Sequence, residues 1–266
     1  MTAPNYIEMR GITKSFGAVN ALSNVDLTLP HGGVLGLIGD NAAGKSTLMK
    51  ILAGAIPHDR GEILIDGQPA GYNHPIGARE AGIEMIYQDF ALVPELTVAQ
   101  NIFLGREVTK TRAGIKVLDR ATMNRRAEEM FGALGLRVPA VTLPVQSLSG
   151  GQQQAVAIAR ATGFDAKLVI MDEPTANLGA PAIEKVRETI TRLKTSGVAV
   201  IIISHRLEDI FAVGDRFLVM KQGHVVGERD VDDTHNADLI EMIVTGQDPR
   251  KSSVSGSAKK HATTTT

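Results

Sequence analysis

The sequence predicts an α/β fold with a largely parallel sheet, because short apolar runs alternate with amphipathic stretches along the chain. Three apolar runs have the length and composition of buried strands: residues 34–38, 168–171 and 198–203. The chain has 266 residues, of which 43% are apolar, so it can build the core of one α/β domain.

The segments around these strands fit the same fold. A helix is expected directly after the first buried strand, over residues 46–52. Residues 180–194 predict a crossover helix between the second and third buried strands, and Gly197 lies just past its end. Upstream of the first buried strand, residues 7–10 and 25–29 have alternating β character, which predicts an antiparallel flank.

Between about residues 90 and 160, helical patterns such as 121–134 dominate and strand signals are few. We therefore expect one domain over residues 1–249. Its α/β core with the antiparallel flank (about 1–89 and 161–249) carries an inserted helical subdomain (about 90–160). Residues 250–266 are polar and of low complexity, and they bury too little apolar area to offset chain entropy, so we expect them to be disordered. We find no internal repeat.

The composition excludes several classes of protein. The formal net charge of −1 provides no basic excess for nucleic acid, and the absence of cysteine excludes a disulfide framework. The first residues lack a basic region followed by an apolar run, so no signal peptide is expected. The longest aliphatic run, 198–203, is far shorter than the roughly 20 residues of a membrane span. Any link to a membrane is therefore expected to pass through a partner.

A phosphate loop of the form Gly-x-x-x-x-Gly-Lys-Ser lies between the first buried strand and the first helix. Backbone N–H groups of such a loop point inward and, with the helix N-terminus, attract phosphate oxygens. Lys45 supplies charge to the β- and γ-phosphates, and Ser46 offers a hydroxyl to Mg²⁺. The alternative is a glycine-rich turn that happens to precede Lys-Ser, which the strand and helix flanks disfavour. The expected nucleotide contacts are Gly39, Asp40, Asn41, Ala42, Ala43, Gly44, Lys45, Ser46 and Thr47.

Two acids, Asp172 and Glu173, directly follow the second buried strand. Hydrolysis of a nucleoside triphosphate needs a base beside the γ-phosphate, and acids that occur together with a phosphate loop suit that role. Without the loop, they would be read as solvated acids at a strand end.

A glycine-rich turn, Leu148-Ser149-Gly150-Gly151-Gln152, precedes the second buried strand. Ser149 is expected to be a helix N-cap, and Gly150 and Gly151 let the backbone approach an anion closely. The turn could therefore hold a second phosphate, although a helix cap alone would also explain Ser149.

Together these segments resemble the ATP-binding cassette (ABC) family over roughly residues 5–246. The resemblance implies a P-loop NTPase (RecA-like) core with an antiparallel β flank and an inserted α-helical subdomain. It implies an ATPase that uses ATP and Mg²⁺, in which Asp172 holds Mg²⁺ through water and Glu173 orients or deprotonates the attacking water. It also implies that residues 148–152 meet the ATP held by another subunit's phosphate loop, so that a homodimer or a pair of cassettes shares two ATPs.

Three further residues acquire a role only from this resemblance. Gln88 matches the family's Q-loop glutamine, a Mg²⁺ ligand and hinge to the helical region. His205 matches the switch histidine that contacts the γ-phosphate, and Phe16 matches the aromatic that stacks on adenine. Without the other motifs, Gln88 would be read as a surface residue, His205 as structural and Phe16 as a core residue.

Two positions depart from the family's pattern. Relatives usually carry glycine where this chain has Ala42, and a methyl group is harmless there only if φ stays negative. In the D-loop, Asn177-Leu178-Gly179, many relatives have aspartate in place of Gly179. The contacts that this loop makes across subunits are therefore open.

Residues 40–50, 149–154 and 204–211 resemble the corresponding strings of bacterial importers of monosaccharides, of the ribose, xylose and fructose type. With one cassette and no repeat, the chain most resembles the single-cassette fructose-import type. This implies a peripheral ATPase subunit on the cytoplasmic face of the inner membrane. Its expected partners are permease subunits and, indirectly, a periplasmic sugar-binding protein, with no nucleic acid. The alternatives are an importer ATPase for another solute, a soluble ABC protein acting on ribosomes or DNA, and a non-catalytic cassette that binds ATP as a structural switch.

Overall fold

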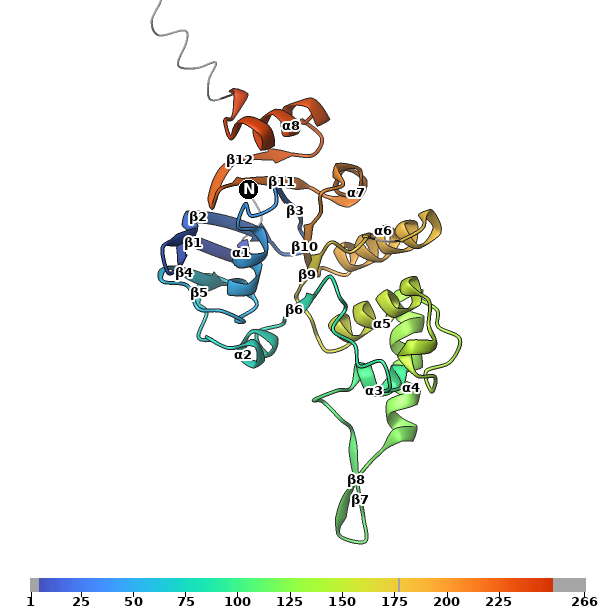
Figure 1. Cartoon of the computed structure of the whole chain (residues 1–266). Coiled ribbons are helices and arrows are strands. Elements are labelled where there is room, and N and C mark those ends of the chain that lie inside the picture. Colours follow the sequence, from blue (N-terminus) through green and yellow to red (C-terminus); the bar gives the residue numbers. More distant parts are fainter. Residues whose placement is uncertain (1–4, 177, 251–266) are drawn as a thin grey trace, which may run out of the picture.

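A computed structural model describes residues 5–176 and 178–250, which fold around two large β-sheets (Figure 1). The larger sheet has the strand order β12-β11-β3-β10-β9-β6. Neighbours from β11 to β6 run parallel, and β12 pairs antiparallel with β11 at one edge. The strands are β3 (Val34–Gly39), β6 (Ile83–Ile86), β9 (Leu168–Asp172), β10 (Ala199–Ile203), β11 (Arg216–Lys221) and β12 (His224–Asp230).

The smaller sheet is antiparallel, has the order β2-β1-β4-β5 and forms the flank that the sequence predicts. Alternate residues of its long strands, such as Ile7 and Met9, are fully buried, which is the pattern of a sheet with one face on the core. The strands are β1 (Asn5–Phe16), β2 (Val19–Pro30), β4 (Arg60–Ile65) and β5 (Gln68–Pro69).

Some helices cover the sheets, and others pack on one another, with α5 doing both. Helix α1 contacts both sheets, through β2 and β3, whereas α3, α4 and α5 contact one another where the helical insertion is expected (Figure 1). The helices are α1 (Lys45–Leu52), α2 (Pro75–Glu80), α3 (Val98–Ile102), α4 (Arg120–Leu134), the 3₁₀ turn η1 (Val145–Ser147), α5 (Gly150–Thr162), α6 (Ala180–Thr195), α7 (Leu207–Val213) and α8 (Asn236–Thr245).

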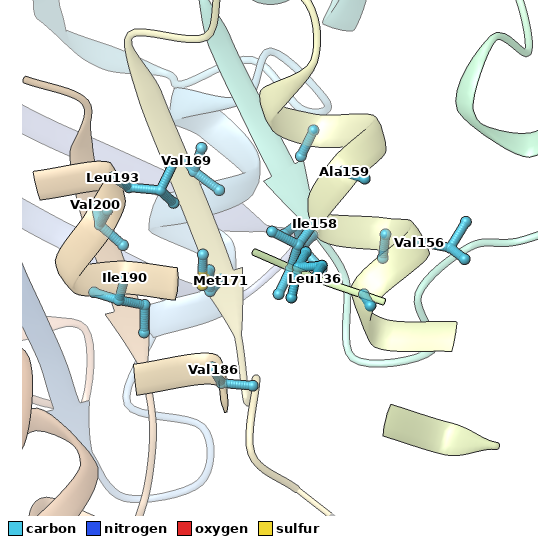
Figure 2. Close-up of a cluster of buried hydrophobic side chains, with 14 of the residues drawn as sticks. Leu136, Val156, Ile158, Ala159, Val169, Met171, Val186, Ile190, Leu193 and Val200 are labelled. Atoms are coloured by element: carbon cyan, nitrogen blue, oxygen red, sulfur yellow. The ribbon is translucent and has the colours of Figure 1, made fainter. Parts of the chain in front are cut away.

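A buried cluster joins α5 and α6 to the middle of the larger sheet (Figure 2). Burial of one aliphatic side chain stabilises the fold by about 1.5–3 kcal/mol, so this cluster holds the two helices and β9 as one packed unit. The side chains labelled in Figure 2 are Leu136, Val156, Ile158, Ala159, Val169, Met171, Val186, Ile190, Leu193 and Val200.

The expected α/β fold is confirmed, with one difference inside the helical region. A two-stranded hairpin of β7 (Thr109–Arg112) and β8 (Ile115–Leu118) lies between α3 and α4, where few strand signals were apparent. Neither strand is the uninterrupted apolar run that marks a buried strand, because β7 is polar and charged and Lys116 interrupts β8.

The domain bounds at residues 90 and 160 stay a prediction, and the tail over residues 251–266 lies outside the described residues. Within the described residues, we find no helix that combines the length and the apolar character needed to span a bilayer.

Candidate nucleotide site

The phosphate loop joins the buried strand β3 to α1, and two of its glycines are required by the fold itself. Gly39 has φ 148°, and a Cβ there would lie 2.1 Å from the Met220 carbonyl oxygen on β11. Gly44 has φ 97°, and a Cβ there would lie 2.7 Å from the carbonyl oxygen of Ala21. A side chain at either position would strain the backbone and displace a neighbouring strand.

The N-terminus of α1 has no capping side chain, so its first backbone N–H groups remain available to an anion. Lys45 folds back over the loop, and its Nζ donates to the carbonyl oxygens of Gly39 at 2.7 Å and Asp40 at 2.8 Å. Burial lowers the pKa of the Lys45 amine, and the nearby carboxylates of Glu173 and Asp172 oppose that shift.

Ala42 adopts φ 66°, in the left-handed region, so the condition under which its methyl group would be harmless is not met. An L-residue in this region costs roughly 1–2 kcal/mol relative to an ordinary conformation, a cost that glycine avoids. The loop therefore keeps the shape that suits glycine even though alanine occupies the position.

A cleft of about 300 Å³ opens in front of the loop and receives residues from four segments of the chain. Gln88 comes from the loop after β6, and Asp172 and Glu173 come from the end of β9. They meet because parallel strands bring their carboxyl ends to one edge of the sheet. The residues lining the cleft are Asn41, Ala42, Ala43, Gly44, Lys45, Ser46, Thr47, Gln88, Asp172, Glu173 and Ile203.

Ser46, Gln88 and Asp172, the three expected Mg²⁺ ligands, all line this cleft. Burial raises the pKa of Asp172 and the Glu173 carboxylate adds to the shift, whereas Lys50, Lys45 and a hydrogen bond with Ser46 oppose it. The described residues contain no group of three or more His, Cys, Asp or Glu side chains arranged to hold a metal alone. This donor set fits Mg²⁺, which is usually bound by few protein oxygens together with phosphate.

Glu173 adopts φ 52°, which turns it out of the strand direction at the end of β9. His205 Nδ1 lies 2.8 Å from Glu173 Oε2, and the imidazole is largely exposed whereas the carboxylate is mostly buried. This close approach does not have hydrogen-bond geometry, so Glu173 Oε2 has no hydrogen-bond partner among the described residues. Because the contact with His205 is not a hydrogen bond, this carboxylate oxygen can still accept one from a water molecule beside the cleft.

Phe16 lies at the end of β1 and is 50% exposed, which excludes the alternative that it is a core residue. Lys14 Nζ lies 5.4 Å from the centre of its ring. Neither Phe16 nor His205 lines the cleft in front of the phosphate loop, so the structure does not place all the expected site residues in the lining of this cleft.

The turn over residues 148–152 lies apart from the phosphate loop and lines a second cavity of about 270 Å³, together with residues of α6. The two cavities share no residue. Ser149 is the expected N-cap of α5: its Oγ accepts from Gln152 N, and Gln152 Oε1 accepts from Ser149 N. A Cβ at Gly150 would meet no atom of the described residues within 4 Å, so their packing does not require a glycine there.

The end of the D-loop leads into α6, where Gly179 is the N-cap residue and supplies no capping side chain. Asn177 lies outside the described residues. Gly179 therefore has a structural place at the start of a helix, while the contacts of this loop with another chain stay a prediction.

Three residues of this site were not expected from the sequence. Arg160, in the last turn of α5, donates to the carbonyl oxygens of Phe90 and Ala91, each at 2.7 Å, in the segment that follows Gln88. The buried amide of Gln154 donates to the carbonyl oxygen of Pro174, just after Glu173. Helix α5 thus anchors both loops that enter the cleft.

The third such residue, Asp209, lies on α7 and is buried. It accepts from Thr175 Oγ1 at 2.5 Å and from Arg187 at 2.6 Å, so the segment after Glu173 is tied to the segment after His205. No local motif marks these partners, because each contact joins positions that are far apart in the sequence.

Comparisons with known proteins agree with this geometry. A family model described as "ABC transporter" matches residues 22–176. The xylose/arabinose import ATP-binding protein of Sulfolobus acidocaldarius is 41% identical over 90% of this chain and 94% of its own length. The fructose import ATP-binding protein of Rhizobium meliloti is 39% identical over 92% of this chain and 96% of its own length.

The ribose import ATP-binding protein of Chromobacterium violaceum is 44% identical over 90% of this chain, which spans only about half (47%) of that protein. Among solved structures, a dimeric bacterial ABC transporter cassette matches with a TM-score of 0.72 and 26% identity, over 85% of this chain and 98% of that chain. Another ATP-binding cassette, in its ADP conformation, has a TM-score of 0.75 at 24% identity and supports the fold alone.

Proposed function

Because the chain belongs to the ABC transporter family, we propose that it is the ATP-hydrolysing subunit of a monosaccharide importer. The observation that carries the proposal is the cleft in which the phosphate loop, Gln88, Asp172 and Glu173 meet. The relatives named above support sugar import, and because their names give different sugars, we propose the class and not one sugar.

In this function, Lys45 exchanges the carbonyl oxygens of Gly39 and Asp40 for the β- and γ-phosphate oxygens of ATP. The uncapped N–H groups of α1 hold the same phosphates. Ser46, Asp172 and Gln88 would hold Mg²⁺, which when bound neutralises charge that develops on the phosphates. Phe16 supports the adenine ring from its exposed place at the end of β1.

Glu173 is the residue that we assign to the attacking water. Its Oε2 has no hydrogen-bond partner among the described residues and the side chain is mostly buried, so it accepts a proton from water or orients that water toward the γ-phosphate. His205 lies against the same carboxylate and contacts the γ-phosphate from the exposed side. Asp209, through Thr175 and Arg187, keeps the two segments at a fixed spacing.

Two chains, or this chain and a second cassette, complete the proposed site. The turn over residues 148–152 lines a separate cavity, and the open space at Gly150 leaves room for atoms from outside the chain. Each ATP therefore lies between the phosphate loop of one chain and this turn of the other. In the cell, the pair attaches to permease subunits at the cytoplasmic face of the inner membrane, and a periplasmic sugar-binding protein delivers the sugar.

The catalytic part is tested with Glu173→Gln, which removes the base and keeps the shape. We expect ATP hydrolysis by the purified chain to fall by about 10²–10⁴-fold while ATP binding is kept. Glu241→Gln, which neutralises an exposed acid on α8, is the control and should hydrolyse ATP normally. Near-normal phosphate release by Glu173→Gln would remove Glu173 from this role.

The pairing is tested by sedimentation of the Glu173→Gln chain, which we expect to be monomeric without nucleotide and dimeric with ATP. Adding Ser149→Arg should block the dimer while ATP stays bound to the monomer. Ser196→Arg, at the exposed end of α6, is the control and should leave association unchanged. A mass that does not depend on ATP, or normal association of the Ser149→Arg chain, would refute the shared site.

The sugar class is tested by uptake of labelled xylose, ribose and fructose in cells with and without the gene. We expect uptake of at least one of the three to depend on the gene and to be lost with Glu173→Gln. Undiminished uptake of all three sugars would overturn the proposed substrate class. The proposed ATPase activity would not be affected by that result, because it has its own test.

A further inference from the structure

The β7–β8 hairpin is the part of the structure that neither the cleft nor the core explains. It projects beyond α3 and α4, and no other element of the described residues covers it (Figure 1). Every residue of both strands is exposed, including Ile115 at 68%, Val117 at 37% and Leu118 at 45%. An isolated two-stranded hairpin is at best marginally stable in water, so this element is suited to contact with something outside the chain.

Strand pairing gives the hairpin two different faces. Lys110 is paired with Val117 and Arg112 with Ile115, and paired residues project to the same side of a sheet. This face therefore presents two cations beside two β-branched aliphatic side chains. The turn between the strands, Ala113-Gly114, has positive φ at both residues, the geometry of a tight two-residue hairpin turn.

The charge of the hairpin has one sign. Residues 109–118 contain three cations, Lys110, Arg112 and Lys116, and no acid. Lys110 pairs with Asp119 at the base of the hairpin. The side chains of Arg112 and Lys116 have no acidic partner among the described residues, which leaves a positive tip on a chain whose net charge is −1.

We propose that this hairpin binds the surface of a phospholipid bilayer that contains anionic headgroups. Its cations pair with the headgroup phosphates while Ile115 and Val117 enter the boundary between headgroups and acyl chains. A bilayer surface suits a face that mixes cations with aliphatic groups, because it accepts both without a matching protein pocket. The proposal rests on the membrane location given under the proposed function, but its test needs no permease.

The test measures co-sedimentation of the full-length chain with vesicles. We expect binding to vesicles of phosphatidylglycerol and phosphatidylcholine, weaker binding at high salt, and little binding to phosphatidylcholine alone. The variant Lys110→Gln/Arg112→Gln/Lys116→Gln should weaken binding to the anionic vesicles by up to about 100-fold. Ile115→Ser/Val117→Ser keeps the charge and should weaken the binding that remains at high salt.

The matched control, Arg10→Gln/Arg60→Gln/Arg125→Gln, removes the same charge from exposed positions elsewhere and should bind as the unaltered chain does. All three variants should hydrolyse ATP normally, which separates this proposal from the proposed function. Equal binding by the hairpin variants and the control, or no binding by the unaltered chain, would overturn the proposal. If the hairpin variants instead lose only their association with permease subunits, the hairpin docks on protein and the lipid proposal is wrong.

Discussion

The N-termini of α1 and α5 both carry glycine beside a polar loop, yet the surrounding structure constrains the residue at these two positions differently. At α1, Gly44 has φ 97°, and a Cβ would press on the backbone of β2. At α5, Gly150 has no positive φ and open space where a Cβ would stand. The fold therefore requires the first glycine and makes no use of the second.

The N-caps of the two helices also differ. Helix α1 has no side-chain cap, whereas Ser149 and Gln152 satisfy the start of α5 reciprocally. The start of α1 therefore has no side chain on its N–H groups, whereas at α5 the chain itself satisfies the N–H groups of Ser149 and Gln152. The comparison teaches that a motif residue without an internal reason points to a contact beyond the chain.

Gly44→Ala is the strongest way to break this contrast on the α1 side. Positive φ and the clash with Ala21 together should destabilise the chain by about 2–5 kcal/mol, with loss of ATP binding, as measured by thermal unfolding and nucleotide titration. Gly67→Ala has φ 73° but open space, so as the control it should cost only about 1–2 kcal/mol. Equal stability losses in the two variants would show that the clash does not matter.

Phe16→Ala tests whether the nucleotide site in front of α1 extends to the end of β1. Loss of one stack between a base and an aromatic ring should weaken ATP binding by about 1–3 kcal/mol, or roughly 5- to 150-fold, in equilibrium binding. Because Phe16 is half-exposed, stability should change little. Val19→Ala, a similarly exposed truncation on β2, should leave affinity unaltered. An unchanged dissociation constant for Phe16→Ala would exclude Phe16 from the site.

Gly150→Ala sharpens the contrast on the α5 side, because stability and association should move in opposite directions. Alanine in a helix is more stable than glycine by up to about 1 kcal/mol, and nothing obstructs its methyl group. The same methyl should weaken ATP-driven pairing of the Glu173→Gln chain, measured by sedimentation. Gly132→Ala on α4 also has open space, so as the control it should gain stability and pair normally. Undisturbed pairing of Gly150→Ala would mean that no partner approaches there.

Ala42→Gly should give the smallest effect. Replacement of an alanine at φ 66° relieves strain, so the chain should gain about 1 kcal/mol of stability in denaturant unfolding. Ala113→Gly, at φ 50° in the hairpin turn, is the matched control outside the cleft and should gain a similar amount. If Ala42→Gly is destabilising, the strain assigned to Ala42 is absent.

The elements that carry the phosphate loop could be predicted because their signals are local. Buried β3 is an uninterrupted apolar run, and the Gly-x-x-x-x-Gly-Lys-Ser string fixes the turn into α1. The β7–β8 hairpin escaped prediction because threonine, lysine and arginine fill β7, and Ala-Gly is a weaker turn signal than Asn-Gly.

Within the site, the residues of sequence motifs could be predicted and their supports could not. Arg160 reads as one more cation in a helix, and only the tertiary fold places it against the carbonyl oxygens of residues 90 and 91. Asp209 likewise follows His205 by a few residues, but its partner Thr175 comes from a different strand end. Conversely, the sequence identified Ala42 as a position where the sign of φ matters, but the value of φ became known only from the backbone of the structure.

Helix α5 has one further consequence. It is 13 residues long, or about 20 Å, and it carries the turn at one end and Arg160 at the other, with Gln154 between them. Through these two side chains it grips the segment after Gln88 and the segment after Glu173. The helix therefore links the two loops mechanically, and a tilt of its first turn would move both loops at the chain's own cleft. If two chains pair as proposed, a contact at the first turn of α5 acts on the cleft of the chain that carries that helix.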